Sequence, residues 1–351
     1  MKSLKRIAIL WPEVPQYAAR LMRAAMNAFD VAIDVISTRS SLPIAGIEEI
    51  LHAPVKWIQP GQTSVNWDDL GLPVPTVLMR SGWSTAAFNV LAGEARGKGV
   101  REVLLMDNPW KGTYRQHLGC AWFRLFRRRR YAAIWVPGQE AARFAGKLGF
   151  PSRQIYVGLY GADPDLFRSS EPLARRERQF IFVGQLIERK GLRVLAQALE
   201  RLQRDGMRLC VDAFGTGALV EDLATVPGLH LAGFLPGDSI AKELAQSRFL
   251  VLPSLDDHWP LVVHEATCCG CGIVTTDCTG SRHELVTDRN GWICAAGSGA
   301  DLARCLREAA GVSEARLREI KTESLRLSAR FSPSAWVSRL GKLLTDMGYS
   351  L

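Results

Sequence analysis

Short apolar runs alternate along this chain with longer segments whose apolar residues follow helical spacing. The first such run is Arg6–Leu10, and helical spacing follows it from Tyr17 to Phe29. Apolar runs of about five residues are typical of strands buried in a parallel sheet, and helices between them are typical of βαβ units. The pattern therefore predicts an α/β protein in which parallel strands are joined through helices.

The same alternation recurs in both halves of the chain. Strands are predicted at 6–10, 31–36, 55–58, 76–79, 100–106, 132–137, 180–183, 209–214, 249–252 and 273–276. Helices are predicted at 17–29, 85–95, 140–148, 194–202, 241–246, 261–269, 301–310, 313–327 and 333–347. Because a domain contains about 150 residues, a chain of 351 residues with two sets of strands predicts two domains. The charge-rich segment 168–179 is interpreted as their linker, which gives domains at 1–168 and 169–332.

Composition is that of a globular protein with a buried core, at 47% hydrophobic and 23% charged residues. No apolar run reaches the length of about 18 residues that a membrane span needs, and the N-terminus shows no cleavage-site pattern. We therefore expect a cytoplasmic protein whose eight cysteines are reduced thiols. Cys268 and Cys271 have C-x-x-C spacing, but no second pair completes four ligands, so they are interpreted as buried packing residues and no metal site is predicted.

The excess of positive over negative charge lies in the first half of the chain. Residues 1–170 contain 22 Lys and Arg against 13 Asp and Glu, whereas residues 171–351 contain 22 of each. The whole net charge of +9 therefore belongs to the first half. This asymmetry predicts that the N-terminal domain meets an acidic surface or an acidic acceptor.

The segment 117–131 combines aromatic and basic residues. Trp122, Phe123 and Phe126 are followed directly by a basic cluster composed of Arg127, Arg128, Arg129 and Arg130. One interpretation is a helix on an anionic membrane surface, where each basic residue contributes about 1 kcal/mol. The other is a solvated helix end whose aromatic residues pack into the N-terminal core. Nucleic-acid binding is not predicted, because no motif that reads a groove accompanies the cluster.

Two carboxylates mark the stretch 253–291. Asp257 is predicted on a loop at the carboxyl end of the strand 249–252, and Glu265 inside the helix that follows. In an open α/β sheet this edge is where ligands bind. A second candidate edge follows the strand 180–183, where a glycine turn leads to Lys190 and a helix. Free N–H groups and the dipole at such a helix start favour a phosphate.

These stretches resemble the signature of glycosyltransferase family 4, a retaining GT-B family within the glycosyl transferases of group 1. The resemblance rests on Pro253, Ser254, Asp257, Trp259, Leu261, Glu265, Ala266, Gly270, Gly280 and Glu284, and on the crossover-like segment 160–167. Lys190 matches the lysine of the family's G-R-L-x-x-x-K-G, while Gln185 replaces its arginine and Arg189 can supply the missing charge. The resemblance implies two facing Rossmann-like domains, with a C-terminal helix at 333–351 that returns to the first domain.

The resemblance also implies a UDP- or GDP-sugar donor, no metal and retention of configuration. Glu265 would bind the ribose, Asp257 the donor sugar, and Lys190 together with the Leu261 N–H the phosphates. The donor-binding residues implied are Gly184, Gln185, Arg189, Lys190, Gly215, Phe234, Leu235, Trp259, Leu261 and Glu265, and the catalytic ones Asp257, Lys190 and Glu265.

On the acceptor side, Asp107 and Asn108 follow the strand 100–106, where relatives often have a His-Asp pair. The loop 11–15 lacks the glycines that many relatives have there. We expect a glycan or lipid-linked acceptor in the synthesis of cell-envelope polysaccharide or lipopolysaccharide. An enzyme that uses such an acceptor would be peripheral on the inner leaflet of the cytoplasmic membrane.

Alternatives stay open at this point. A nucleotide-sugar epimerase or a phosphorylase could share the architecture. A non-catalytic partner subunit would account for Gln185 and for Pro260, which replaces a family glycine and removes a backbone N–H. Asp257 could also serve only to cap the helix near Leu261.

Overall fold

The computed structural model describes residues 2–39 and 46–350, and it divides into two compact units. The first comprises Met1–Gly161 and Pro333–Leu351, and the second comprises Ala162–Ser332. The boundary predicted at residue 168 is therefore wrong by a few residues. The backbone N–H of Ala162 donates to Nδ1 of the buried His264 at 2.8 Å, and Phe167 is buried, so the segment 162–168 packs with the second unit.

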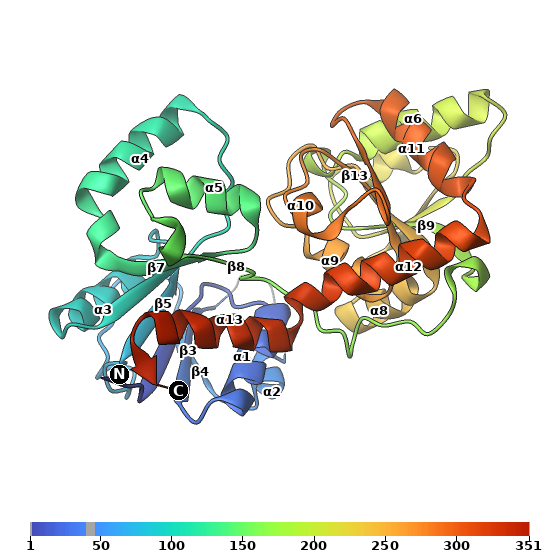
Figure 1. Cartoon of the computed structure of the whole chain (residues 1–351). Helices are drawn as coiled ribbons and strands as arrows, with labels where there is room; N and C mark the ends of the chain where they lie inside the picture. Colours follow the sequence, from blue (N-terminus) through green and yellow to red (C-terminus); the bar gives the residue numbers. More distant parts are fainter. Residues whose placement is uncertain (1, 40–45, 351) are drawn as a thin grey trace. The chain divides into compact units, whose positions relative to one another are not determined.

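The first unit is built on one parallel sheet with strand order β4-β3-β2-β5-β6-β7-β8 (Figure 1). The chain runs outward from β2 through β3 to β4 and then begins again at β5 on the other side of β2. The sheet consists of β2 (Arg6–Leu10), β3 (Ala32–Thr38), β4 (Val55–Ile58), β5 (Val77–Ser81), β6 (Arg101–Leu105), β7 (Tyr131–Val136) and β8 (Ile155–Val157). Its helices are α1 (Gln16–Ala28), α2 (Ile47–Leu51), α3 (Ala86–Gly97), α4 (Tyr114–Phe126) and α5 (Gln139–Lys147).

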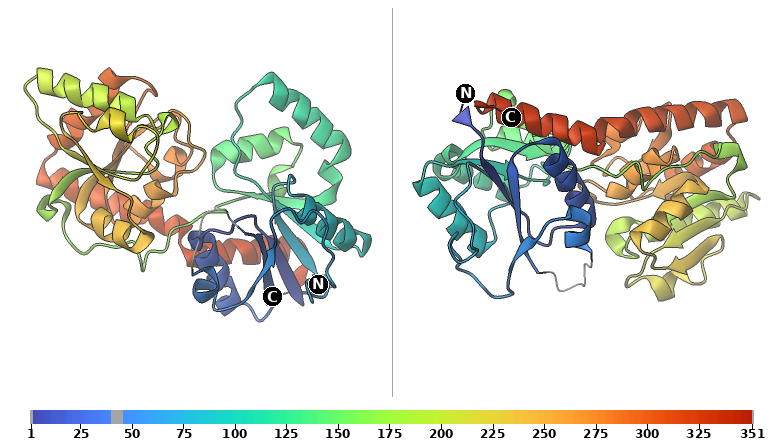
Figure 2. Two further views of the ribbon diagram at one scale, coloured as in Figure 1. Left: turned by 180° about the vertical axis from the view of Figure 1, so that it is seen from behind. Right: turned by 90° about the horizontal axis from the view of Figure 1, so that it is seen from below.

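The C-terminal helix α13 (Pro333–Asp346) belongs to the first unit, which confirms the predicted return of the chain. It packs beside α1 (Figure 1). Trp336 on α13 lies against Trp135 of β7, with ring centroids 4.8 Å apart, and its Nε1–H donates to the Leu159 carbonyl at 2.9 Å. The short strands β1 (Lys2–Ser3) and β15 (Tyr349–Ser350) pair in parallel, so the two ends of the chain lie side by side (Figure 2).

The second unit repeats this architecture with six parallel strands in the order β11-β10-β9-β12-β13-β14. The strand order reverses between β9 and β12. The strands are β9 (Arg178–Val183), β10 (Val211–Phe214), β11 (Leu229–Gly233), β12 (Ser247–Leu252), β13 (Gly272–Thr276) and β14 (Gly291–Cys294). The helices are α6 (Leu192–Arg204), α7 (Val220–Leu223), α8 (Gly237–Ala245), α9 (Leu261–Cys268), α10 (Arg282–Leu285), α11 (Gly299–Ala310) and α12 (Glu314–Ser328).

The segment 168–179, predicted as a polar linker, is part of the second unit instead. Arg176 is buried there, and its guanidinium donates to the carbonyls of Ser247 at 2.7 Å and Cys269 at 2.6 Å. Leu173 is buried as well. High charge content suggested solvent exposure, but backbone carbonyls of neighbouring elements accept from both Nη groups of this arginine in the interior.

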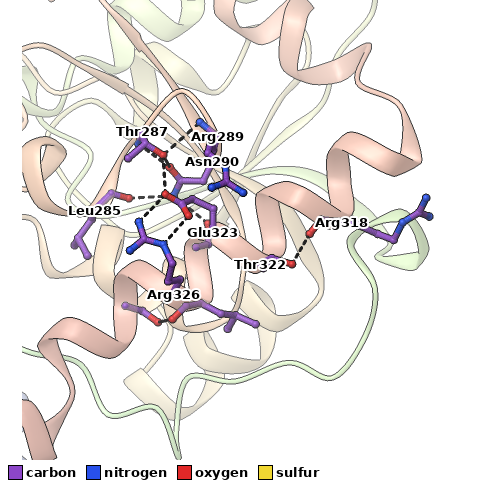
Figure 3. A network of polar contacts seen from close by, with 11 residues as sticks. Leu285, Thr287, Arg289, Asn290, Arg318, Thr322, Glu323 and Arg326 are labelled. Atoms are coloured by element: carbon purple, nitrogen blue, oxygen red, sulfur yellow. Dashed lines mark hydrogen bonds and ion pairs between the residues drawn. The ribbon is translucent and has the colours of Figure 1, made fainter.

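A polar network ties α12 to the turn before β14 (Figure 3). Both Glu323 oxygens accept from Arg326 at 2.8 Å, and Thr287 donates to the same carboxylate at 3.2 Å. Asn290 donates to the Leu285 carbonyl at 3.0 Å. The hydrogen bonds from Arg326, and then that from Thr287, lower the pKa of Glu323 to about 2. Because α12 packs against α9, the network supports the helix that carries Glu265.

Candidate functional site

The predicted donor residues gather at the carboxyl edge of the second sheet. The loops that leave β9 and β12 lie next to each other there, because these two strands pair in parallel at the position where the strand order reverses. In doubly wound sheets this reversal opens a crevice at the carboxyl ends of the strands, and ligands bind in it. Lys190 follows β9 and Asp257 follows β12, so the sequence places one charged side chain on each side of the crevice.

Glycines allow the backbones of these loops to approach closely. A Cβ on Gly215, after β10, would lie 1.9 Å from the Gly184 carbonyl oxygen, after β9. Gly191 has φ +72°, and a Cβ there would lie 1.9 Å from the Pro253 carbonyl oxygen. Side chains at these positions would push the loops apart. The glycines therefore hold the start of α6 against the loop that follows β12.

Lys190 and Asp257 form the central contact of the site. The Lys190 Nζ lies 2.5 Å from Asp257 Oδ2, with side chains that are only 12% and 9% exposed. Arg189 contributes a second cation, since its Nη1 lies 3.7 Å from Asp257 Oδ1 and donates to the Asp256 carbonyl at 2.8 Å. The alternative that Asp257 caps the next helix is not supported, because the N-cap of α9 is Pro260 and the Asp257 carboxylate contacts Lys190 and Ser254 instead.

Buried hydroxyl groups hold the Asp257 loop in place. Ser254 donates to Asp257 Oδ2 at 3.4 Å, and Thr276 donates to the Ser254 carbonyl at 2.6 Å. The backbone of Asp257 forms an isolated parallel bridge with Thr279, and the Gly280 N–H donates to the Asp257 carbonyl at 2.8 Å. Sequence reasoning missed the roles of Thr276 and Thr279. Thr276 ends a buried strand and Thr279 lies in the turn after it, and the sequence gives no other signal of their contacts.

Glu265 lies in the second turn of α9 and is partly buried. Within the described part of the chain, no residue forms a hydrogen bond or ion pair with its carboxylate, and burial raises its pKa to about 7. The preceding residue, His264, is fixed, since Nδ1 accepts from Ala162 and Nε2–H donates to the Ser328 carbonyl at 2.9 Å. An unpaired carboxylate on a firmly held helix is suited to accept hydroxyl groups from a ligand.

The remaining predicted donor residues divide into two groups. Phe234 and Leu235 follow β11 on the same edge, and the ring of Phe234 is exposed, as is the side chain of Gln185. Leu261 is partly exposed at the first position of α9. Trp259 differs, because it is 7% exposed and its ring lies 5.4 Å from that of Phe331. The structure therefore gives Trp259 a packing role beneath the loop and offers little of its surface to a ligand.

Asp107 and Asn108 line a cavity of about 270 Å³ in the first unit, at the carboxyl ends of β5 and β6. The Tyr160 hydroxyl donates to Asp107 Oδ2 at 3.1 Å, and burial is the main cause that raises the pKa of Tyr160. Trp83, partly exposed, lines the same cavity. In the loop 11–15, which lacks glycine, the buried Trp11 ring lies 6.0 Å from the ring of Tyr160. This loop therefore makes an aromatic contact with a residue that lines the cavity.

The cysteines of the C-x-x-C spacing are buried in the core of the second unit. The Cys271 thiol donates to the carbonyls of Leu244 and Ser247, each at 3.3 Å, which is a packing role. Over residues 2–39 and 46–350, no group of three or more His, Cys, Asp or Glu side chains is arranged to hold a metal ion. In the same residues no helix is long and apolar enough to cross a bilayer.

The sequence is similar to those of known glycosyltransferases. Residues 177–310 match the family described as glycosyl transferases group 1. The amylovoran biosynthesis glycosyltransferase AmsK of Erwinia amylovora is 25% identical over an alignment of 173 residues. The alignment covers 45% of this chain and 42% of AmsK. The chain thus spans about two fifths of the length of the curated relatives it matches.

Solved structures show the same fold over nearly the whole chain. Anabaena Alr3699/HepE in complex with UDP superposes with a TM-score of 0.77 at 14% identity, covering 97% of this chain and 100% of that one. A glycosyltransferase from Rickettsia africae gives a TM-score of 0.76 at 10% identity, with coverage of 99% and 100%. Residues 177–310 of the second unit are therefore similar to the glycosyl transferases of group 1, and the chain as a whole has the two-domain GT-B fold.

Proposed function

We propose that this protein is a retaining glycosyltransferase that moves a sugar from a UDP- or GDP-sugar to a glycan or lipid-linked acceptor in the synthesis of cell-envelope polysaccharide. The observation that carries the proposal is the Lys190–Asp257 pair at the point of strand reversal in a group 1 glycosyltransferase domain. Two of the similar proteins support the substrate classes. HepE was crystallised with UDP-glucose, and AmsK is named for amylovoran biosynthesis.

The donor diphosphate is proposed to bind at the start of α6. Gly191 is the N-cap, no side chain caps this helix, and its first turn contains no acidic residue. Backbone N–H groups and the helix dipole therefore favour an anion there, and Lys190 adds a full charge. Glu265 accepts the ribose hydroxyls, because it is the carboxylate of this edge that has no protein partner. Phe234 is the exposed aromatic residue that the base meets.

The chemistry follows from where charge develops. As the bond between the anomeric carbon and the leaving phosphate oxygen breaks, the sugar becomes positive and the diphosphate becomes more negative. Lys190, Arg189 and the start of α6 stabilise the diphosphate, while Asp257 holds hydroxyls of the sugar. The acceptor oxygen attacks on the face that the diphosphate leaves, and its proton passes to the leaving phosphate oxygen. These cations make a metal ion unnecessary in this proposal, so EDTA is expected to leave transfer unchanged.

The acceptor is proposed to enter the cavity of the first unit. A sugar ring presents apolar C–H faces and a rim of hydroxyls. Trp83 offers an aromatic surface for the first, and Asp107 with Asn108 offers acceptors and donors for the second. The cavity of about 270 Å³ has room for one sugar ring rather than for a chain of them.

The test is a panel of UDP-, GDP-, ADP- and TDP-sugars given to the purified chain, with nucleotide release measured and the product followed by NMR. We expect one nucleotide to be preferred and the anomeric configuration to be retained. An inverted product would contradict the mechanism. Binding of a nucleotide sugar without transfer to any glycan acceptor would favour the non-catalytic partner subunit, and release of an epimerised sugar would favour the epimerase.

A further inference from the structure

One helix of the first unit exposes an apolar face. Along the 13 residues of α4, large apolar side chains point to solvent at intervals of three or four positions. Leu125 is 76% exposed and Phe126 is 62% exposed. The exposed set is Tyr114, Leu118, Trp122, Leu125 and Phe126. Singly exposed apolar residues are ordinary, but a continuous stripe on one helix marks an interaction surface.

The opposite face explains why α4 is held with this stripe outward. Phe123 is buried and stacks on Tyr131 with ring centroids 5.8 Å apart. After the helix, Arg128 lies over the Phe150 ring at 4.0 Å and donates to the carbonyls of Gly149 and Tyr131. The interpretation that the aromatic residues pack into the core is therefore correct for Phe123 alone. Arg128 is a structural residue, and its assignment to a membrane surface is wrong.

The charge around the stripe indicates the partner. Residues 108–139 contain seven Lys and Arg and no Asp or Glu. Arg129 and Arg130 are exposed at the end of α4, and the Arg127 guanidinium lies 5.2 Å from the Trp122 ring centroid. A second copy of this surface would bring like charges together, which disfavours self-association. Aromatic residues beside arginines instead match the boundary between lipid headgroups and acyl chains.

We infer that α4 docks on an anionic lipid bilayer, with Trp122, Leu125 and Phe126 inserted at the interface and Arg129 and Arg130 on lipid phosphates. The docked element is close to the acceptor cavity along the chain. Asn108 lines that cavity, and Gln116 on α4 donates to the Pro109 carbonyl at 3.0 Å. Docking would bring the cavity to an acceptor held in the membrane. This last step rests on the proposed function, whereas lipid binding itself does not.

The experiment is co-sedimentation of the full chain with vesicles of phosphatidylcholine alone or with phosphatidylglycerol added. Wild type should bind the anionic vesicles, and binding should weaken with added salt. A variant with Trp122→Ser, Leu125→Ser and Phe126→Ser should bind at least about tenfold more weakly. Arg129→Glu with Arg130→Glu should lose binding to the anionic vesicles. Leu325→Ser and Arg201→Glu, at exposed positions of the second unit, are the matched controls and should bind as wild type does.

Thermal shift with UDP-glucose separates this inference from the proposed function, because all these variants should keep the shift of wild type. The inference is overturned if folded wild type ignores anionic vesicles, or if the triple serine variant binds them as well as wild type does. It is also overturned if the stripe instead supports a dimer in solution that the triple variant loses. Vesicle binding without any nucleotide shift would remove the proposed function and leave the docking surface in place.

Discussion

The two units share a strand order and differ in what their sheet edges present. At the strand reversal of the second unit, glycines draw the backbones together and a nearly buried Lys190–Asp257 pair crosses the crevice. At the carboxyl edge of the first sheet, Trp83 and Tyr160 line a cavity together with Asp107, whose carboxylate accepts from the Tyr160 hydroxyl. The sheet edge of the second unit is suited to phosphates, and the sheet edge of the first unit is suited to a sugar ring. Under the proposed function one architecture would thus serve two ligand classes, because the loops and not the strands decide the chemistry.

The largest expected effect is on donor binding, at the carboxyl edge of the sheet in the second unit. Lys190→Ala should weaken UDP-glucose binding about 100-fold or more, because it removes the charged donor beside the diphosphate site. It should also destabilise the fold, since the nearly buried Asp257 side chain loses its closest partner. Isothermal titration calorimetry and thermal unfolding measure the two effects.

Two further variants make this prediction specific. Lys190→Ala combined with Asp257→Asn should recover stability without recovering donor binding, because the carboxylate that lost its closest cation is gone but Lys190 is still missing. Lys242→Ala, at an exposed position of α8 in the same unit, should change neither quantity. Unchanged donor binding by the Lys190→Ala variant would contradict the proposal that the diphosphate binds beside Lys190 in the second unit.

The first edge is tested by Asp107→Asn, which keeps an oxygen for the Tyr160 hydroxyl and removes the charge. The KM for the acceptor should rise about tenfold, as for a lost charged hydrogen bond. Donor affinity should stay the same. A change in donor affinity with an unchanged acceptor KM would mean that the two ligand classes are assigned to the wrong units.

The pH dependence of donor binding is expected to report on Glu265. Its pKa is raised to about 7 by burial, so the carboxylate that we propose accepts the ribose hydroxyls becomes protonated as the pH falls below that value. Affinity for UDP-glucose, whose diphosphate does not titrate in this range, should fall about tenfold from pH 8 to pH 6. Glu265→Gln should bind weakly with a flat profile, and a variant that keeps the wild-type slope would exclude Glu265 as its source.

The smallest effect concerns stability. Glu323→Gln should lower the Tm by a few degrees, because it weakens the paired hydrogen bonds from Arg326. The pKa of Glu323 is depressed to about 2, so its stabilisation is present above the unfolded value and is lost as the pH falls from about 4 toward 2. Glu319→Gln, an exposed partner of Arg316, is the control and should leave the Tm nearly unchanged. Equal shifts in both variants would contradict the structural role of the network.

Much of the fold could be predicted because apolar runs and helical spacing are local signals. The strand at 249–252 and the helix at 261–269 lie within a few residues of β12 and α9. The short elements β8 and β14 were missed, because three or four residues are too few to show a period. Segment 168–179 was wrongly predicted to be an exposed linker. Its charge content does not reveal that Arg176 forms hydrogen bonds with backbone carbonyls in the interior.

The site was predictable in its residues but not in its contacts. Lys190 and Asp257 were recognised by their place in motifs, yet they are 67 positions apart, so only the parallel pairing of β9 with β12 brings them to 2.5 Å. The exposure of the apolar stripe on α4 was equally unpredictable from the sequence. The sequence shows aromatic residues beside arginines, and only packing decides that Phe123 turns inward while Trp122 and Leu125 turn outward.

Hydrogen–deuterium exchange with and without UDP-glucose tests most directly the claim that the donor binds the crevice of the second unit. We predict protection of residues 184–195 and 253–266, with no change in the loops 11–15 and 81–85 of the first unit. Lys190→Ala should abolish that protection. Protection confined to the first unit, or none at saturating UDP-glucose or any other nucleotide sugar of the panel, would contradict the account.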